Sequence, residues 1–192
     1  MIRTIATRLI SLLRRFGSSE RGVAAVEFAL VMPFLITLYF GSMEAAALYT
    51  ADRRVNTISA TMGDLVSQWD PDDGAIPTGT MTDYFKAANG LIYPMATTNL
   101  KQVVSFVQVN ADGTTKVLWS KGYNGGTPRV VNSSYPLAAG KMMNQVARGS
   151  WVIASEVYYS YKPLLGVVFS TSLSLSHENL FLPRYQAAIT AS

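Results

Sequence analysis

One carboxylate stands inside an apolar stretch near the N-terminus of this chain. Glu27 follows the small residues 23–26 and precedes residues 28–43, which are uncharged and mostly large and apolar. A carboxylate near the centre of a bilayer costs about 2.5–3.5 kcal/mol even on mild scales, so its presence there calls for a use. Pairing with a cation on a neighbouring helix would be such a use, and it would fix the register of the two helices. The alternative is that Glu27 lies in the headgroup layer and reaches toward water.

The apolar stretch is long enough to carry this carboxylate into a membrane. Residues 23–47 predict one transmembrane helix. Residues 1–21 predict a basic amphipathic helix on an anionic membrane surface, because apolar residues recur there at helical spacing between arginines. Since basic residues flank the cytoplasmic end of a span, the N-terminus is expected in the cytoplasm and the chain after Tyr49 outside it.

Two further residues of this helix have predicted roles. Pro33 removes one helix hydrogen bond, so it is expected to bend or loosen the helix. Glu44 stands about one hydrocarbon thickness after Glu27, so the two carboxylates are expected to bracket the membrane. Glu44 is interpreted as an interface residue at the exit side rather than as a partner contact.

The residues around Glu27 also form a motif. Gly22 follows a basic tract, Glu27 is the fifth residue after it, and aromatic Phe28 comes next. This arrangement resembles the prepilin peptidase site of type IV pilin-like proteins. Residues 21–35, RGVAAVEFALVMPFL, are similar to the start of TadE/TadG-like pseudopilins of the tight-adherence (Flp) type IVb pilus system. Residues 154–166 and 182–184 resemble the C-terminal part of TadE-like proteins, and the chain has no room for the long von Willebrand-type domain of some TadG proteins.

The resemblance implies roles for particular residues. It implies cleavage between Gly22 and Val23, with Arg21, Glu27 and Phe28 serving recognition and assembly. Gly22 suits a cleavage site because it weakens a helix and carries no side chain. The new ammonium on Val23 is then expected to pair with Glu27 of a neighbouring subunit.

The resemblance also implies a function and partners. It implies a minor pseudopilin in the bacterial inner membrane, with its C-terminal domain in the periplasm or associated with the pilus. The implied partners are a prepilin peptidase, pilin and other pseudopilin subunits, the inner-membrane assembly platform and the lipid bilayer. A single-pass, uncleaved periplasmic binding or adhesion domain is the alternative.

Other readings of the N-terminus are a mitochondrial presequence and a secretory signal peptide cut within residues 44–47. Neither explains Gly22 together with Glu27. The predicted organisation is therefore a leader at residues 1–22, a long helix at residues 23–69 and an extracytoplasmic domain at residues 70–192.

The helix pattern continues beyond the membrane. Apolar residues recur at steps of three, four and seven, which predicts one stripe facing a packed domain; they are Leu48, Val55, Ile58, Met62, Leu65 and Trp69. The sequence DPDDG at residues 70–74 predicts a turn. It does not fit a calcium-binding EF-hand loop, because Met81 stands where the twelfth-position Glu belongs.

The remaining sequence predicts short strands with helical interruptions. Residues 103–109 and 115–120 flank the turn NADG at 110–113, which predicts a hairpin. Strands are also predicted at 151–161 and 169–175, a helical turn at 82–88 and a weak helix at 137–148, with His177 ending a strand. The predicted fold is α+β, with the long helix packed on the apolar face of an antiparallel sheet. Tyr159 and Tyr161, with Tyr158, are assigned to sheet packing rather than to an adhesive surface.

Composition excludes several function classes. The 192 residues allow one membrane helix and one modest domain. With no cysteine, the chain has no disulfide and no thiol nucleophile, and its single histidine leaves no plausible zinc set or Ser-His-Asp constellation beyond His177 alone. The net charge is only +4 and several arginines lie in the leader, so no nucleic-acid surface is indicated. We therefore expect no enzyme and no cofactor.

Overall fold

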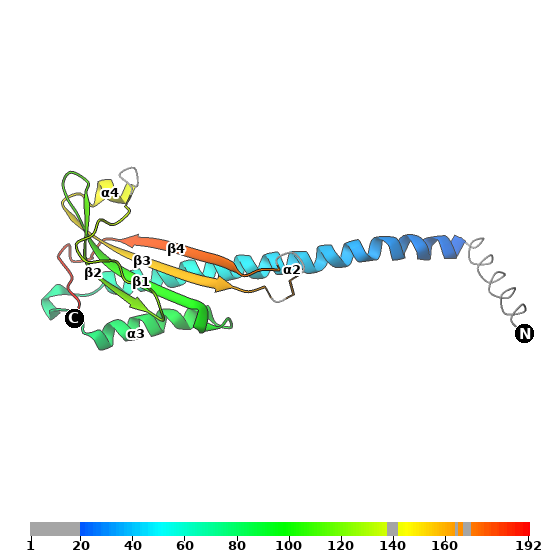
Figure 1. Cartoon of the computed structure of the whole chain (residues 1–192), viewed down its shortest axis with the longest axis horizontal. Coiled ribbons are helices and arrows are strands. Elements are labelled where there is room, and N and C mark those ends of the chain that lie inside the picture. The colour runs from blue at the N-terminus through cyan, green and yellow to red at the C-terminus, as the bar shows by residue number, and fades with distance from the viewer. Residues whose placement is uncertain (1–19, 138–141, 164, 167–169) are drawn as a thin grey trace, which may run out of the picture. The chain divides into compact units, whose positions relative to one another are not determined.

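The computed structural model describes residues 20–137, 142–163, 165–166 and 170–192. The chain divides into two compact units. The first comprises Met1–Ala46 and Leu164–Ser170, and the second comprises Ala47–Pro163 and Thr171–Ser192. The order of the elements can be followed in Figure 1.

A single long helix dominates the N-terminal part of the chain. Helix α2 runs over Glu20–Ser67, with Pro33 inside it, which confirms the long helix predicted from the sequence. The hydroxyl of Thr37 donates to the carbonyl oxygen of Pro33 at 2.9 Å. The predicted bend at Pro33 and the predicted domain boundaries stay predictions.

The surroundings of α2 change along its length. Between Val23 and Met43 its apolar side chains are exposed, with Phe28 at 60% and Leu30 at 78%. From Ala51 to Val66 one stripe of the helix is fully buried. The exposed part suits lipid or neighbouring helices, and the buried part belongs to a protein core.

The second unit is built on a four-stranded antiparallel sheet. The strands are β1 (Leu100–Val109), β2 (Thr115–Tyr123), β3 (Ser150–Tyr161) and β4 (Leu173–Phe181), in the order β2-β1-β3-β4. The predicted hairpin joins β1 to β2, and Gly113 of its turn has a φ of 87°. In this turn the Thr114 hydroxyl donates a hydrogen bond to the Asp112 carboxylate, and this bond lowers the pKa of Asp112. The α+β fold class is confirmed.

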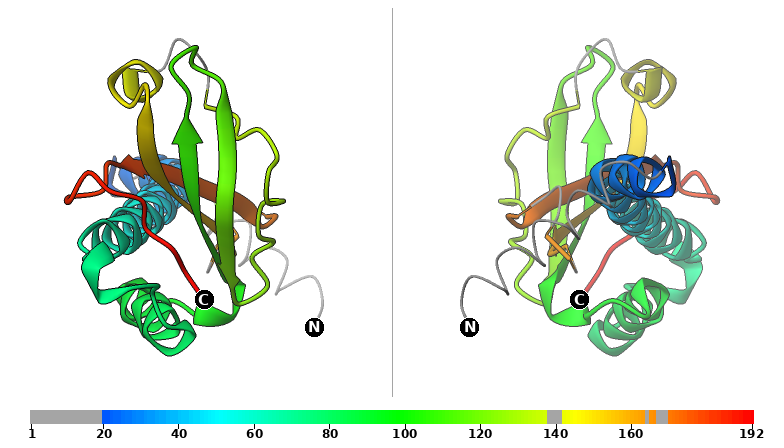
Figure 2. Two further views of the ribbon diagram at one scale, coloured as in Figure 1. Left: turned by 90° about the vertical axis from the view of Figure 1, so that its left-hand side faces the viewer. Right: turned by 90° about the vertical axis from the view of Figure 1, so that its right-hand side faces the viewer.

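One face of the sheet carries the main core. Val55, Ile58 and Met62 of α2 pack with apolar residues of the strands, including Val104, Phe106, Ile153, Val157 and Tyr159. Helix α3 (Thr78–Asn89) covers the same face through Met81 and Phe85 (Figure 2). The predicted packing of the helix on the sheet is confirmed, and so is the stripe, except that Val66 rather than Leu65 enters the core.

Polar side chains join α2 to strand β4. His177 Nε2 lies 2.7 Å from Asp52 Oδ1, and the Asn179 amide donates to Asn56 at 2.9 Å. The prediction that His177 ends a strand is wrong, because His177 lies in the middle of β4. These polar residues point at the helix where an apolar pattern would be expected, so hydropathy alternation fails to identify the strand.

Several predicted bounds are corrected by the structure. The helical turn expected at 82–88 is the longer α3, and the weak helix at 137–148 is reduced to α4 (Met142–Val146) among the described residues. The strand expected at 169–175 is displaced to β4, and residues 167–169 lie outside the described residues. Short 3₁₀ helices occupy Pro71–Asp73, Gly90–Ile92 and Thr97–Asn99. The first of these is the predicted DPDDG turn, capped by the Asp70 carboxylate.

The C-terminal segment returns to the start of the domain. Ala191 forms a parallel bridge with Ile76, and Ser192 N donates to the Ile76 carbonyl. The indole of Trp119 donates to the carbonyl oxygen of Ile189 at 2.7 Å. Residues 189–192 therefore join the segment after α2 to strand β2.

Candidate functional site

The predicted processing motif lies in α2, close to the first described residue of the chain. Glu20 is the first described residue and already lies in α2, and the Gly22–Val23 bond is helical rather than extended. A peptidase that acts on extended backbone would therefore have to unwind the helix locally at this bond.

The assembly residues of the motif face outward. Glu27, Phe28 and Val23 are all exposed. Val23 and Glu27 lie one helical turn apart, on the same side of α2. The structure thus brings the candidate cation and the candidate carboxylate onto one exposed surface. The roles assigned to Arg21, Gly22, Val23, Glu27, Phe28 and Pro33 stay predictions.

Glu44, the second carboxylate of the apolar part of α2, is buried. It is only 3% exposed and accepts a hydrogen bond from the Gly166 backbone N–H. Both residues belong to the first unit. A partner more than one hundred residues away in sequence leaves no local pattern, so sequence reasoning missed this contact.

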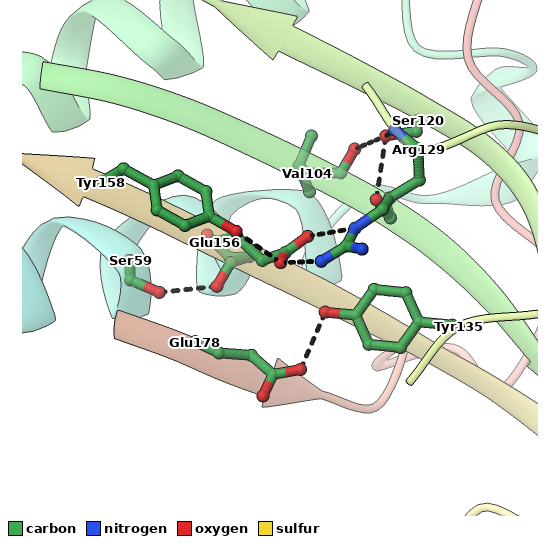
Figure 3. A network of polar contacts seen from close by, with 10 residues as sticks. Ser59, Val104, Ser120, Arg129, Tyr135, Glu156, Tyr158 and Glu178 are labelled. Carbon is green, nitrogen blue, oxygen red and sulfur yellow. Dashed lines mark hydrogen bonds and ion pairs between the residues drawn. The ribbon is translucent and has the colours of Figure 1, made fainter. Parts of the chain in front are cut away.

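A second group of polar residues lies on the outer face of the sheet, the face turned away from α2. Its centre is Glu156 of β3, which is 6% exposed. Glu156 receives two hydrogen bonds from the Arg129 guanidinium, one of them from Nε at 3.0 Å, and a third from the Tyr158 hydroxyl at 2.9 Å (Figure 3). This bidentate pair fixes the plane of the guanidinium.

Two tyrosines complete this outer-face cluster. Tyr135 donates to Glu178 Oε1 at 2.8 Å, and the Arg129 guanidinium carbon lies 5.3 Å from the Tyr135 ring centre. Burial raises the pKa of both Tyr135 and Tyr158, and the nearby Glu156 charge adds to each shift. Both phenols therefore remain protonated donors at neutral pH. Glu156 and Glu178 are directly opposed across β3 and β4, so Arg129 also relieves repulsion between two carboxylates.

An open cavity of about 500 Å³ adjoins the cluster. Two cross-strand pairs form its floor, Lys101 with Tyr158 and Val103 with Glu156. Its wall is the connection after β2, which contributes Gly125, Gly126, Thr127, Pro128, Arg129, Val130, Ser133 and Ser134. The cavity therefore combines cations, hydroxyl groups and exposed backbone.

The wall of the cavity is held closely against the sheet. A Cβ on Gly126 would overlap the carbonyl oxygen of Gln102 in β1, and a Cβ on Gly122 would overlap the Gly126 carbonyl. Asn124 has a φ of 52°, and its amide donates to the Leu100 carbonyl at 2.7 Å. The contacts of Gly126 and Asn124 are made with backbone atoms of β1, so the connection after β2 cannot shift toward the sheet unless that strand moves as well.

Replacement of Gly126 by alanine is expected to destabilise the domain by about 1–3 kcal/mol, because the added methyl group meets backbone rather than a flexible side chain. Gly79→Ala is the matched control. Gly79 lies in α3 with nothing within 4 Å of an added Cβ, so the same change should be neutral or stabilising. Thermal unfolding of both variants followed by circular dichroism tests the difference. Equal midpoints for the two variants would contradict the close packing of the wall.

Sequence reasoning did not single out Arg129 or Glu156. The confirmed alternation of β3 places Tyr159 and Tyr161 in the core and Tyr158 on the other face, where Glu156 also lies. This alternation was the one sequence signal that could have placed Glu156 on the outer face of the sheet, beside Tyr158. Arg129 lies in an irregular connection, where no periodicity marks it.

The described residues contain no group of three or more His, Asp or Glu side chains placed to hold a metal ion. Comparison with known families bears on the other candidate site. Residues 22–61 match the TadE-like protein family. The resemblance inferred from residues 21–35 is thereby confirmed for this TadE-like segment. No curated protein and no solved structure shows a significant match to the chain.

The match of residues 22–61 to the TadE-like family supports a general statement about function. It indicates a component associated with Tad pili, with other pilus components as partners in general terms. TadE-like proteins are pilus structural components, and the match gives no support for an enzyme. Gly22–Ser67 is also long and apolar enough to anchor the chain in a membrane. The matched range ends at residue 61, so the likeness of residues 154–166 and 182–184 to TadE-like proteins stays a prediction.

Proposed function

We propose that this protein is a TadE-like minor pseudopilin that takes part in assembling a tight-adherence pilus after cleavage between Gly22 and Val23. The observation that carries the proposal is the exposed apolar surface of α2 between Val23 and Met43, which begins at the predicted cleavage site and lies within the matched TadE-like segment. Such a surface requires lipid or other helices around it. A pseudopilin inserts in the membrane and then packs against pilin helices, so it has both environments.

Glu27 supplies the specific part of this packing. Cleavage would place an ammonium on Val23, and the exposed Glu27 carboxylate of an adjacent subunit would neutralise it where lipid and helices exclude water. Because Val23 and Glu27 also lie one turn apart in the same helix, pairing within one chain competes with pairing between chains. The proposal requires the pair between chains, since only that pair fixes the register of two subunits.

The experiment that tests the proposal is N-terminal sequencing of the protein extracted from membranes. A pseudopilin processed by a prepilin peptidase begins at Val23. A protein that retains Met1 would instead be an anchored binding or adhesion domain, the second candidate. The outer-face cavity is the observation that favours this second candidate, because a binding domain needs a site of that kind.

The orientation of the protein is a separate prediction. A reporter enzyme joined after Ser192 is expected to be active only when it functions outside the cytoplasm, because the basic residues precede the apolar helix. A flexible linker is needed, since the Lys121 ammonium and the Thr78 hydroxyl both donate to the terminal oxygen of Ser192. A cytoplasmic reporter in the same position is the control. Activity of that control alone would reverse the proposed topology.

A further inference from the structure

The outer-face cavity has the features of a binding site that the proposed function does not use. Its floor and wall come from β1, β3 and the connection after β2, all within the second unit. Its approximate volume of 500 Å³ is that of a small-molecule site. The close approach of Gly122 and Gly126 to neighbouring backbone holds its wall in place, so the cavity is formed before any ligand enters.

The charges in the cavity favour a negatively charged ligand. Glu156 is the acidic residue that lines it, and that carboxylate is already occupied by Arg129 and Tyr158. Lys101, in contrast, is exposed and forms no ion pair or side-chain hydrogen bond with the described residues. The cavity therefore has one carboxylate that is neutralised and one ammonium that is not.

Arg129 adds directed donors to this charge. Its Nε and Nη2 are bound to Glu156, which leaves Nη1 without a hydrogen bond to the described residues. The guanidinium is fixed at one edge by Glu156 and on one face by the Tyr135 ring. A guanidinium held in this way loses little conformational entropy when it binds an oxyanion.

The remaining lining suits the ring of a sugar. Thr127, Ser133 and Ser134 supply hydroxyl groups, and Tyr158, which is 39% exposed, supplies an aromatic surface. The Ser133 hydroxyl already donates to the Val130 carbonyl and the Ser134 hydroxyl pairs with that of Thr115, but each hydroxyl oxygen can accept a further hydrogen bond. An aromatic face next to several hydroxyl groups can accommodate the apolar and polar sides of a pyranose ring. Val103 and Val130 add a small apolar part.

We propose that the cavity formed by Lys101, Arg129, Tyr158 and the connection 125–134 binds a sugar carrying a carboxylate group, with Lys101 and Arg129 at the carboxylate. This site would give the protein a means of contacting acidic saccharides in addition to pilus components. It does not depend on cleavage at Gly22 or on the role of Glu27.

The test uses the full chain in lipid nanodiscs and two probes, N-acetylmuramic acid and N-acetylglucosamine. The two sugars share the ring and the acetamido group, and only the first has a carboxylate. Saturation-transfer NMR and titration calorimetry should show binding of N-acetylmuramic acid that is at least about fivefold tighter, a difference of about 1 kcal/mol for one exposed charged contact. Equal affinity for the two sugars, or no binding of either, would overturn the proposal.

Variants assign the binding to this cavity. Lys101→Glu should abolish the preference for N-acetylmuramic acid, because it reverses the unpaired charge. Lys116→Glu is the matched control, since Lys116 is exposed on β2 and does not line the cavity. Circular dichroism verifies that both variants are folded. Loss of the preference in both variants would show a general charge effect and refute the proposed site.

A second variant keeps the charge and changes the donors. Arg129→Lys retains a cation beside Glu156 but removes the free Nη1 group. Its affinity for N-acetylmuramic acid should fall severalfold, while its affinity for N-acetylglucosamine should change little. Unchanged affinity for the acidic sugar would exclude Arg129 from the site.

Discussion

Replacement of Glu27 by alanine is expected to abolish assembly while leaving processing intact. The variant removes a charge that the membrane disfavours, so insertion and folding of the C-terminal domain should be unharmed or slightly improved. Cleavage should continue because the predicted peptidase site is at Gly22. The Val23 ammonium would then lack its partner, and a buried charge left unpaired costs about 3–5 kcal/mol. That cost is large enough to prevent a marginal association between subunits.

The measurement is co-purification of the processed variant with pilin-like partners, together with surface pilus counts. Glu27→Asp should give a partial defect because it keeps the charge and loses reach, and Glu27→Gln should behave like Glu27→Ala. Thr37→Val is the matched control: the Thr37 hydroxyl bonds to Pro33 within its own helix, so its loss should not affect assembly. Normal pili in Glu27→Ala would leave Glu27 as a residue of the membrane interface.

Replacement of Gly22 by isoleucine is expected to block processing, so that full-length precursor accumulates in the membrane. The Gly22–Val23 bond lies within helix α2, and cleavage requires local extension and close approach of the peptidase. A β-branched side chain at Gly22 would obstruct that approach. Immunoblotting of membrane fractions separates precursor from mature protein.

Gly41→Ile provides the control for this variant. It introduces the same side chain in the same helix, far from the predicted cleavage site, and should be processed at the normal rate. If Gly22→Ile and the unmodified protein were processed equally, cleavage between Gly22 and Val23 would be contradicted. Failure of both variants would point to a membrane insertion defect instead.

The features that sequence analysis predicts well are those carried by local patterns. The apolar run and the stripe of Val55, Ile58 and Met62 have helical spacing, and the structure confirms one helix that packs on a sheet. The β1–β2 hairpin follows from NADG between two apolar segments. In each case the residues that specify the element are neighbours in sequence.

The features that sequence analysis misses depend on distant residues. Strand β4 contacts α2 through His177 and Asn179, so its inward face is polar and does not resemble a core strand. The outer-face cluster requires the register that sets Val103 opposite Glu156, and Arg129 reaches it from an irregular connection. Such contacts are fixed by the tertiary structure, and the types of the single residues do not indicate their partners.

The return of the C-terminal segment to Ile76 governs the order in which this chain can fold. Synthesis of α2 precedes that of residues 189–192, yet the Trp119 indole and Ile76 find their partners only in this later segment. Until that segment is made, the Trp119 indole of β2 and the backbone of Ile76 lack these partners and are open to unintended contacts. The core of the domain can therefore be completed only after residues 189–192 have been synthesised. Chaperones that shield an unfinished chain would act on this protein between the synthesis of α2 and the synthesis of residues 189–192. Shortening residues 189–192 would prolong the time for which these chaperones stay bound.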